Sequence, residues 1–117
     1  MPDIKSELTV TKIEPTDLNK IQKYQLTSEK DQLNITIELP KELTPLKENE
    51  KVYIQISDKP LETKNTKIAL EGKISRKTKT EDKHIYHASF GGLQMKIETT
   101  KEEKILQTAR TIYFNIT

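Results

Sequence analysis

Side chains with the potential for metal or acid–base chemistry gather in one short part of the chain. His84 and His87 are its only two histidines. Residues three apart on a β-strand point to opposite faces, so the two imidazoles share a metal ion only if the strand bulges. The chain has no cysteine, and no acidic cluster completes a ligand set. We therefore expect no metal site.

A catalytic nucleophile has equally little support. Ser89 stands near His87 and Asp82 in the sequence, but no Gly-x-Ser-x-Gly elbow accompanies them. Gly91 and Gly92 lack the spacing of a phosphate-binding loop, and they precede a predicted strand rather than a helix. The sequence predicts a protein that is not an enzyme on its own and has no cofactor or small-molecule substrate. An enzyme built on a small barrel is the least favoured alternative.

Basic side chains are concentrated between residues 73 and 83. With one neighbouring aromatic residue, the set consists of Lys73, Arg76, Lys77, Lys79, Lys83 and Tyr86. Lysines and an aromatic ring on a barrel surface suit single-stranded nucleic acid, through phosphate contacts and base stacking. Glu81 and Asp82 interrupt the run, and lysine is abundant throughout, so a solvated loop is the favoured interpretation. A free-standing single-strand-binding module that uses the basic hairpin 73–83 is the alternative function.

Composition limits the remaining classes of protein. The 117 residues suit a single domain, 1–117, and 20 Lys and Arg nearly balance 18 Asp and Glu. A formal net charge of +2 gives no overall field that would attract nucleic acid. No apolar run approaches the length of a membrane span, and no segment resembles a signal peptide. We expect an intracellular protein without a membrane partner.

Alternation of apolar and polar residues dominates the chain and predicts about eight strands. The clearest apolar faces are Leu33, Ile35, Ile37 and Leu39; Val52, Ile54 and Ile56; Ile68, Leu70 and Ile74; Leu93, Met95 and Ile97; and Ile112, Phe114 and Ile116. Alternation is weaker at 8–15, where Ile13 is out of step as at a bulge, and at 21–26 and 86–90. Short strands at this spacing indicate an all-β antiparallel barrel or sandwich.

Turn signals separate these strands. Pro40 and Pro45 bracket one turn, and polar stretches at 58–67 and 76–83 predict two loops. The capping-box pattern from Thr100 to Glu103 predicts a short helix that runs through Leu106. Gly91 and Gly92 are two of the three glycines. Between two strands they predict a tight primed turn, which needs positive φ at both central residues.

The sequence around this turn resembles a known family. Residues 89–98 read SFGGLQMKIE, which is similar to the signature of subunit 8 of the DNA-directed RNA polymerases of archaea and eukaryotes. The segments Val10 to Pro15, Asn19 to Ile21 and Leu33 to Leu39 resemble the first three strands of the same family. Ala88 departs from the pattern, since the family usually carries an aromatic residue there. The resemblance extends over almost the whole chain.

The resemblance implies a fold and a function. The fold would be a small antiparallel barrel of the oligonucleotide/oligosaccharide-binding type. The protein would be a non-catalytic assembly subunit of a nucleotidyltransferase complex, docked on the largest polymerase subunit near the pore and funnel. Its short, Cys-free and Lys/Glu-rich sequence favours the compact archaeal form, in the cytoplasm of an archaeal cell. Contact with nucleic acid would be weak and indirect at most.

We expect the docking site at the predicted hairpin, because such a turn can present main-chain groups to a partner with few side chains in the way. The expected partner-binding residues are Ser89, Phe90, Gly91, Gly92, Gln94 and Lys96. Phe90 would pack inward beneath the turn, and the two glycines would let the partner approach the main chain. Gln94 and Lys96 would face outward. Leu93, Met95 and Ile97 would belong to the core.

Overall fold

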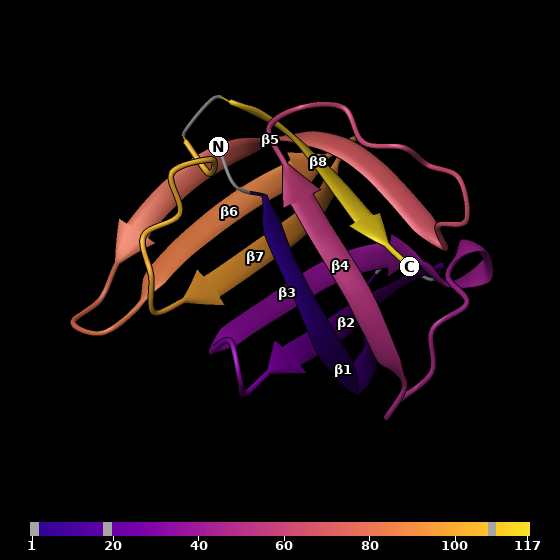
Figure 1. Ribbon diagram of the computed structural model, residues 1–117. Helices are drawn as coiled ribbons and strands as arrows, with labels where there is room; N and C mark the ends of the chain where they lie inside the picture. The colour runs from indigo at the N-terminus through magenta and orange to yellow at the C-terminus, as the bar shows by residue number, and fades with distance from the viewer. Residues whose placement is uncertain (1–2, 18–19, 108–109) are drawn as a thin grey trace.

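Eight antiparallel strands close into a barrel in the computed structural model, which describes residues 3–17, 20–107 and 110–117 (Figure 1). The strands are β1 (Ile4–Pro15), β2 (Ile21–Ser28), β3 (Leu33–Pro40), β4 (Lys51–Ser57), β5 (Ile68–Lys79), β6 (His84–Phe90), β7 (Leu93–Thr99) and β8 (Thr111–Ile116). Asn19, which belongs to the family resemblance, lies outside the described residues. The predicted all-β fold class and number of strands are confirmed.

The order of strands around the barrel is β1-β2-β3-β7-β6-β5-β8-β4. Hairpins join β1, β2 and β3, and two more join β5, β6 and β7. The pairs β3–β7, β5–β8, β8–β4 and β4–β1 bring together strands that are not sequential. Such crossovers distinguish a Greek-key barrel of the predicted oligonucleotide/oligosaccharide-binding type from an up-and-down barrel.

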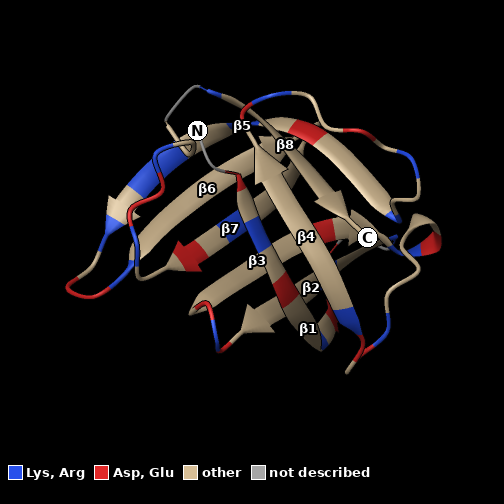
Figure 2. Cartoon of the chain, viewed as in Figure 1, with Lys and Arg blue, Asp and Glu red and all other residues tan. Residues whose placement is uncertain are grey.

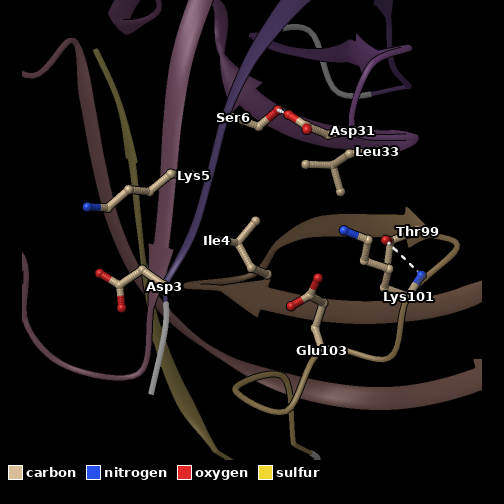
Figure 3. A pocket seen from close by; sticks show the side chains of 9 residues that line it. All are labelled: Asp3, Ile4, Lys5, Ser6, Asp31, Leu33, Thr99, Lys101 and Glu103. Atoms are coloured by element: carbon tan, nitrogen blue, oxygen red, sulfur yellow. Dashed lines mark hydrogen bonds between the residues drawn. The ribbon is translucent and has the colours of Figure 1, made fainter.

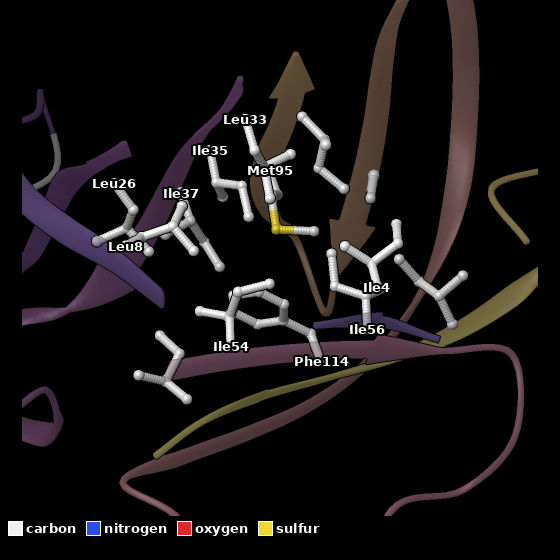
Figure 4. Close-up of a cluster of buried hydrophobic side chains, with 14 of the residues drawn as sticks. Ile4, Leu8, Leu26, Leu33, Ile35, Ile37, Ile54, Ile56, Met95 and Phe114 are labelled. Atoms are coloured by element: carbon white, nitrogen blue, oxygen red, sulfur yellow. The ribbon is translucent and has the colours of Figure 1, made fainter. Parts of the chain in front are cut away.

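The apolar faces predicted from the alternation point into the barrel (Figure 4). Ile35, Ile54 and Phe114 are fully buried. Met95 and Ile97 are buried as predicted, but Leu93 is only half-buried. The prediction for Leu93 is wrong because pairing between β3 and β7 ends at Ile37–Met95. No β3 residue therefore covers the first residue of β7.

Two β-bulges adjust which side chains face inward. The register of β1 against β2 shifts between Val10 and Lys12, which confirms the bulge suggested by the position of Ile13. A second shift, between Ile74 and Arg76 of β5, is not evident from the sequence pattern. It reverses the inward and outward sides of the last part of β5.

The segment that follows β7 is a loop, so the predicted helix from Thr100 to Leu106 is wrong. The side chain of Thr100 donates a hydrogen bond to Gln32 Oε1 at 2.9 Å instead of capping a helix. The main-chain N–H of Glu103 donates to the Tyr86 hydroxyl at 2.8 Å. Ile105 and Leu106 are buried in the core. Tertiary packing of these two residues therefore outweighs the local helix signal.

The connection from β3 to β4 contains a 3-10 helix at Lys41–Leu43. The predicted loop 58–67 is confirmed, since it joins β4 to β5. Half of the predicted loop 76–83 is strand, because β5 continues to Lys79, and a tight turn remains, closed by a hydrogen bond from Thr80 N–H to Lys83 O at 2.9 Å. Within the described ranges, no helix is long and apolar enough to cross a membrane.

Candidate docking surface

The β6–β7 hairpin ends in a two-residue turn formed by Gly91 and Gly92. Phe90 and Leu93 are paired directly below it. The φ angles of the two glycines are 59° and 91°, and positive φ at both central residues defines the type I′ geometry predicted from the sequence. Both glycines are exposed. A Cβ atom built on either would have no neighbour within 4 Å, so the turn presents bare main chain to its surroundings.

Phe90 supports the turn from below, as predicted. Its side chain is buried, and its ring centroid lies 6.4 Å from that of Phe114 on β8. The ring packs on Gly72 of β5, where an added Cβ would lie 2.5 Å from Phe90 Cδ1. Gly72 is therefore the residue that lets β6 approach β5 beneath the turn. Its place on the apolar side of a strand was the only sequence signal, and the predicted site omits it.

Three further predicted docking residues lie near the turn. Ser89 is half-buried and pairs with Gln94 across the hairpin. Gln94 is exposed, and its main-chain N–H donates a hydrogen bond to Glu38 Oε1 at 3.1 Å. Lys96 is half-buried and faces outward, with its Nζ 3.1 Å from Glu98 Oε1. The structure thus brings the predicted docking residues together on one end of the β6–β7 hairpin.

A pocket lined by side chains of both charges adjoins these residues on the outer face. It is lined by Lys23, Thr36, Glu38, His87, Gln94, Met95 and Lys96. His87 pairs with Lys96 across the strands, and its Nε2 lies 3.3 Å from Arg76 Nη2. Partial burial lowers the pKa of His87, and the charges of Arg76 and Lys96 lower it further. Because Arg76 can only donate, this contact is a hydrogen bond only when His87 Nε2 carries no proton.

The bulge in β5 divides the predicted basic set between two faces. Lys73 and Arg76 pair with the outward-facing Ser89 and His87. Lys77 and Lys79 instead pair with residues on the opposite face of β6, Tyr86 and His84. Figure 2 shows the basic bands of β5 near the acidic turn at 81–82. The basic residues therefore do not form one continuous surface.

Acidic neighbours also partly neutralise this set. Lys77 Nζ lies 3.7 Å from Glu102 Oε1 and 5.7 Å from the centroid of the Tyr86 ring. Lys83 Nζ lies 3.8 Å from Glu98 Oε2. Tyr86 itself is fully buried. The predicted stacking role of Tyr86 is therefore wrong, since its ring belongs to the core and its hydroxyl accepts the hydrogen bond from Glu103.

A second cavity lies between the start of β1 and the loop after β7. Figure 3 shows Ser6 and Asp31 on one side of it and Glu103 on another. Ser6 Oγ donates to Asp31 Oδ2 at 2.5 Å, and Lys101 N–H donates to Thr99 Oγ1 at 3.2 Å. Burial raises the pKa of Glu103, while nearby Lys101 opposes the shift. These groups hold loops to the barrel and do not assemble a nucleophile with a base.

The metal and catalytic sites considered from the sequence are not assembled in the part of the chain described. His84 and His87 lie on opposite faces of β6. Among the described residues, no group of three or more histidine or acidic side chains could hold a metal ion. The described residues define a closed antiparallel β-barrel with a bare, exposed glycine turn.

Comparison with known proteins identifies the family. The family model for the RpbG subunit of DNA-directed RNA polymerase matches residues 3–117, and the chain belongs to this family. The resemblance to subunit 8 is thereby confirmed, and the protein is a non-catalytic subunit of the polymerase. Its expected partners are other polymerase subunits.

Two further comparisons do not change this family assignment. No curated protein matches the chain. Among solved structures, the chain is similar to the cytoplasmic molybdate-binding protein ModG, crystallised with molybdate bound. The TM-score is 0.41 and the identity 11%, over 97% of this chain and 89% of the ModG chain.

Proposed function

We propose that this subunit assembles into the polymerase by docking on the largest subunit through the turn surface, defined as Ser89, Phe90, Gly91, Gly92, Gln94 and Lys96. The observation that supports this proposal is the bare turn, in which Gly91 and Gly92 are exposed and have open space where a Cβ would lie. An incoming surface can reach the main chain there without displacing a side chain. The catalytic chemistry of nucleotide addition belongs to the partner subunits.

The surroundings of the turn suit a fixed docking site. Phe90 and Gly72 interlock directly beneath it, and Glu38 holds the N–H of Gln94 beside it. A rigid surface loses little conformational entropy on binding, so more of the interaction energy appears as affinity. We place the assembled protein in the cytoplasm of an archaeal cell, with the polymerase.

The proposal is tested by adding a side chain to the turn without changing the fold. Asn tolerates positive φ, and Asn-Gly is a favoured type I′ sequence, so Gly91→Asn preserves the turn. We expect this variant to bind polymerase assembled without the subunit about tenfold more weakly than the wild type, or worse. The measurement is a titration of the folded variant against that polymerase.

The matched control is Lys30→Asn, an exposed position in the turn between β2 and β3. It should bind with unchanged affinity. A folded Gly91→Asn variant that binds as tightly as the wild type would show that the turn is not the docking site. Circular dichroism and a denaturation midpoint for each variant establish that the comparison concerns binding alone.

Free-standing binding of single-stranded nucleic acid is the less favoured function. The basic set is split between two faces, and its aromatic member Tyr86 is buried. We expect only weak affinity that falls steeply with salt. Neutralising Lys73, Arg76, Lys77 and Lys79 together should leave docking on the polymerase unchanged. A loss of docking in this variant would favour the basic hairpin as the interface.

A further inference from the structure

Strand β5 extends beyond the β6–β7 hairpin and leaves part of one edge open. On one side, residues Ile68–Lys73 pair with β8. On the other side, pairing with β6 begins only at Lys73, opposite Ser89. Residues 68–71 are therefore paired on one edge only, while Gly72 lies against Ser89 and Phe90 of β6. This open edge starts where the bare glycine turn ends.

The hydrogen-bond pattern shows which main-chain groups face the open edge. Ile74 N–H donates to Arg110 O at 3.2 Å, toward β8. In an antiparallel pair the direction of the main-chain groups alternates along the strand. The N–H and C=O groups of Ala69 and Glu71 therefore point away from β8. Both residues are exposed, and the pairing of β5 with β6 does not include them.

We propose that an extended segment of the docked polymerase subunit adds to β5 as a further strand at Ala69 and ends against the glycine turn. Unpaired main-chain groups on an exposed edge are recognised by another extended main chain, which completes the ladder. This inference rests on the proposed function, because it takes the turn surface as the docking site and identifies how the partner binds beside it.

The register explains why strand addition needs a bare turn. Lys73 pairs with Ser89, so two residues further along in the same register Glu71 lies opposite Gly91. Gly91 therefore occupies the place opposite Glu71, and a segment that pairs with Ala69 ends against the glycines. A side chain at Gly91 would meet the last residue of that segment.

The outer face next to this edge suits an apolar side chain on the incoming segment. A groove of about 270 Å³ runs between the loop 58–67 and strands β5 and β8. Its walls include Pro60, Leu61 and Tyr113, and its floor includes Ala69. Asn115 Nδ2 donates to Glu62 O at 2.7 Å and holds the loop in place. A strand residue beside Ala69 would direct its side chain toward this groove.

The barrel has a second open edge, and it is protected. Residues 4–8 of β1 pair with β4, while pairing with β2 begins at Thr9. The charged residues Lys5 and Glu7 lie along that edge, and the hydrogen bond from Ser6 to Asp31 ties the β2–β3 turn against it. Charged side chains and covering turns are the usual protection of edge strands. The β5 edge carries the small Ala69 beside one charged residue, Glu71.

Proline substitution tests the proposal. Ala69→Pro removes an N–H that faces solvent and leaves the β8 ladder intact, a position that edge strands tolerate. We expect it to weaken binding to polymerase assembled without the subunit by about tenfold. Lys5→Pro, at the equivalent position on the β1 edge, is the matched control and should change affinity by less than about twofold.

Hydrogen exchange on the wild-type subunit tests strand addition independently of any substitution. The amide of Ala69 should become protected in the assembled polymerase, while those of Lys5 and Glu7 keep their free rates. If the Ala69 amide exchanges as fast in the complex as in the free chain, strand addition is wrong, whether or not Ala69→Pro folds. If Ala69→Pro binds the polymerase as tightly as the wild type while Gly91→Asn binds more weakly, only the strand-addition inference is overturned. If both variants bind as tightly as the wild type, the proposed function is overturned as well.

Discussion

The ring of Phe90 lies against the main chain of Gly72, so close that a methyl group at position 72 would overlap it. An added Cβ would lie 2.5 Å from Phe90 Cδ1 and 2.2 Å from the main-chain oxygen of Ser89. The overlap with Ser89 involves backbone, which cannot rotate away as a side chain can. This contact fixes how closely β6 packs beside β5, and it therefore fixes the position of the glycine turn at the end of β6.

Gly72→Ala should therefore destabilise the fold. Forcing an extra methyl group into a packed interior costs about 1–3 kcal/mol, and the overlap with main chain favours the upper part of that range. Chemical denaturation measures the change in the free energy of unfolding. Gly91→Asn serves as the control, because its side chain enters open space. Equal stability of Gly72→Ala and wild type would show that the hairpin shifts at no cost.

The turn should distinguish between side chains by their tolerance of positive φ. Gly91 has a φ of 59°, which costs a non-glycine residue about 1–2 kcal/mol and a β-branched one more, because its Cβ crowds the carbonyl. Gly91→Val should lower the free energy of unfolding by at least that amount, while Gly91→Asn loses less. Thermal and urea denaturation of both variants make the comparison. Identical stability of the two would contradict the type I′ assignment.

The pKa of His87 should lie below its ordinary value of 6.5. Burial and the charges of Arg76 and Lys96 disfavour the imidazolium form, so Arg76→Gln should raise the pKa of His87. NMR titration of the imidazole protons measures it, with Lys30→Gln as the control. A pKa at or above 6.5 in the wild type would contradict the described contacts.

The same shift makes stability depend on pH in a stated direction. Since the folded pKa of His87 is lowered, the unfolded chain binds more protons between the folded value and 6.5. The contribution of His87 to stability is therefore complete above 6.5 and falls as the pH drops toward the folded pKa. His87→Gln should remove this part of the pH dependence.

Leu106 should behave as a core residue although it lies in a loop. It is fully buried beside Ile105, and truncation of a buried leucine to alanine costs about 2–5 kcal/mol. Leu106→Ala should therefore lower the denaturation midpoint strongly. Lys104→Ala, at an exposed position in the same loop, should have little effect. A small effect of Leu106→Ala would show that the loop does not close the barrel.

The loop after β7 shows which contacts cannot be predicted from the sequence. Period-two alternation predicted all eight strands, because each half-buried strand carries its pattern locally. The segment at Thr100 carries a local helix signal as well, yet its Thr100 and Glu103 bond to distant Gln32 and Tyr86. Those partners come from the closure of the barrel. Strand order and these contacts depend on pairings between strands far apart in sequence, which no local pattern records.

The candidate site was predictable to a similar extent. The Gly91–Gly92 turn has a local signature, and the structure confirms its geometry and the inward position of Phe90. The sequence analysis did not include Gly72 in the site, because its role depends on the Phe90 ring, which packs on it from the neighbouring strand β6. Tyr86 was misassigned as exposed, although it shares the inward face of β6 with Ala88 and Phe90.

The structure of the polymerase assembled with this subunit is the most direct test of the docking site. We predict that Gly91 and Gly92 lie in van der Waals contact with the largest subunit, with Gln94 beside the same interface. A complex in which this turn faces solvent while another face of the barrel meets the partner would contradict the proposal.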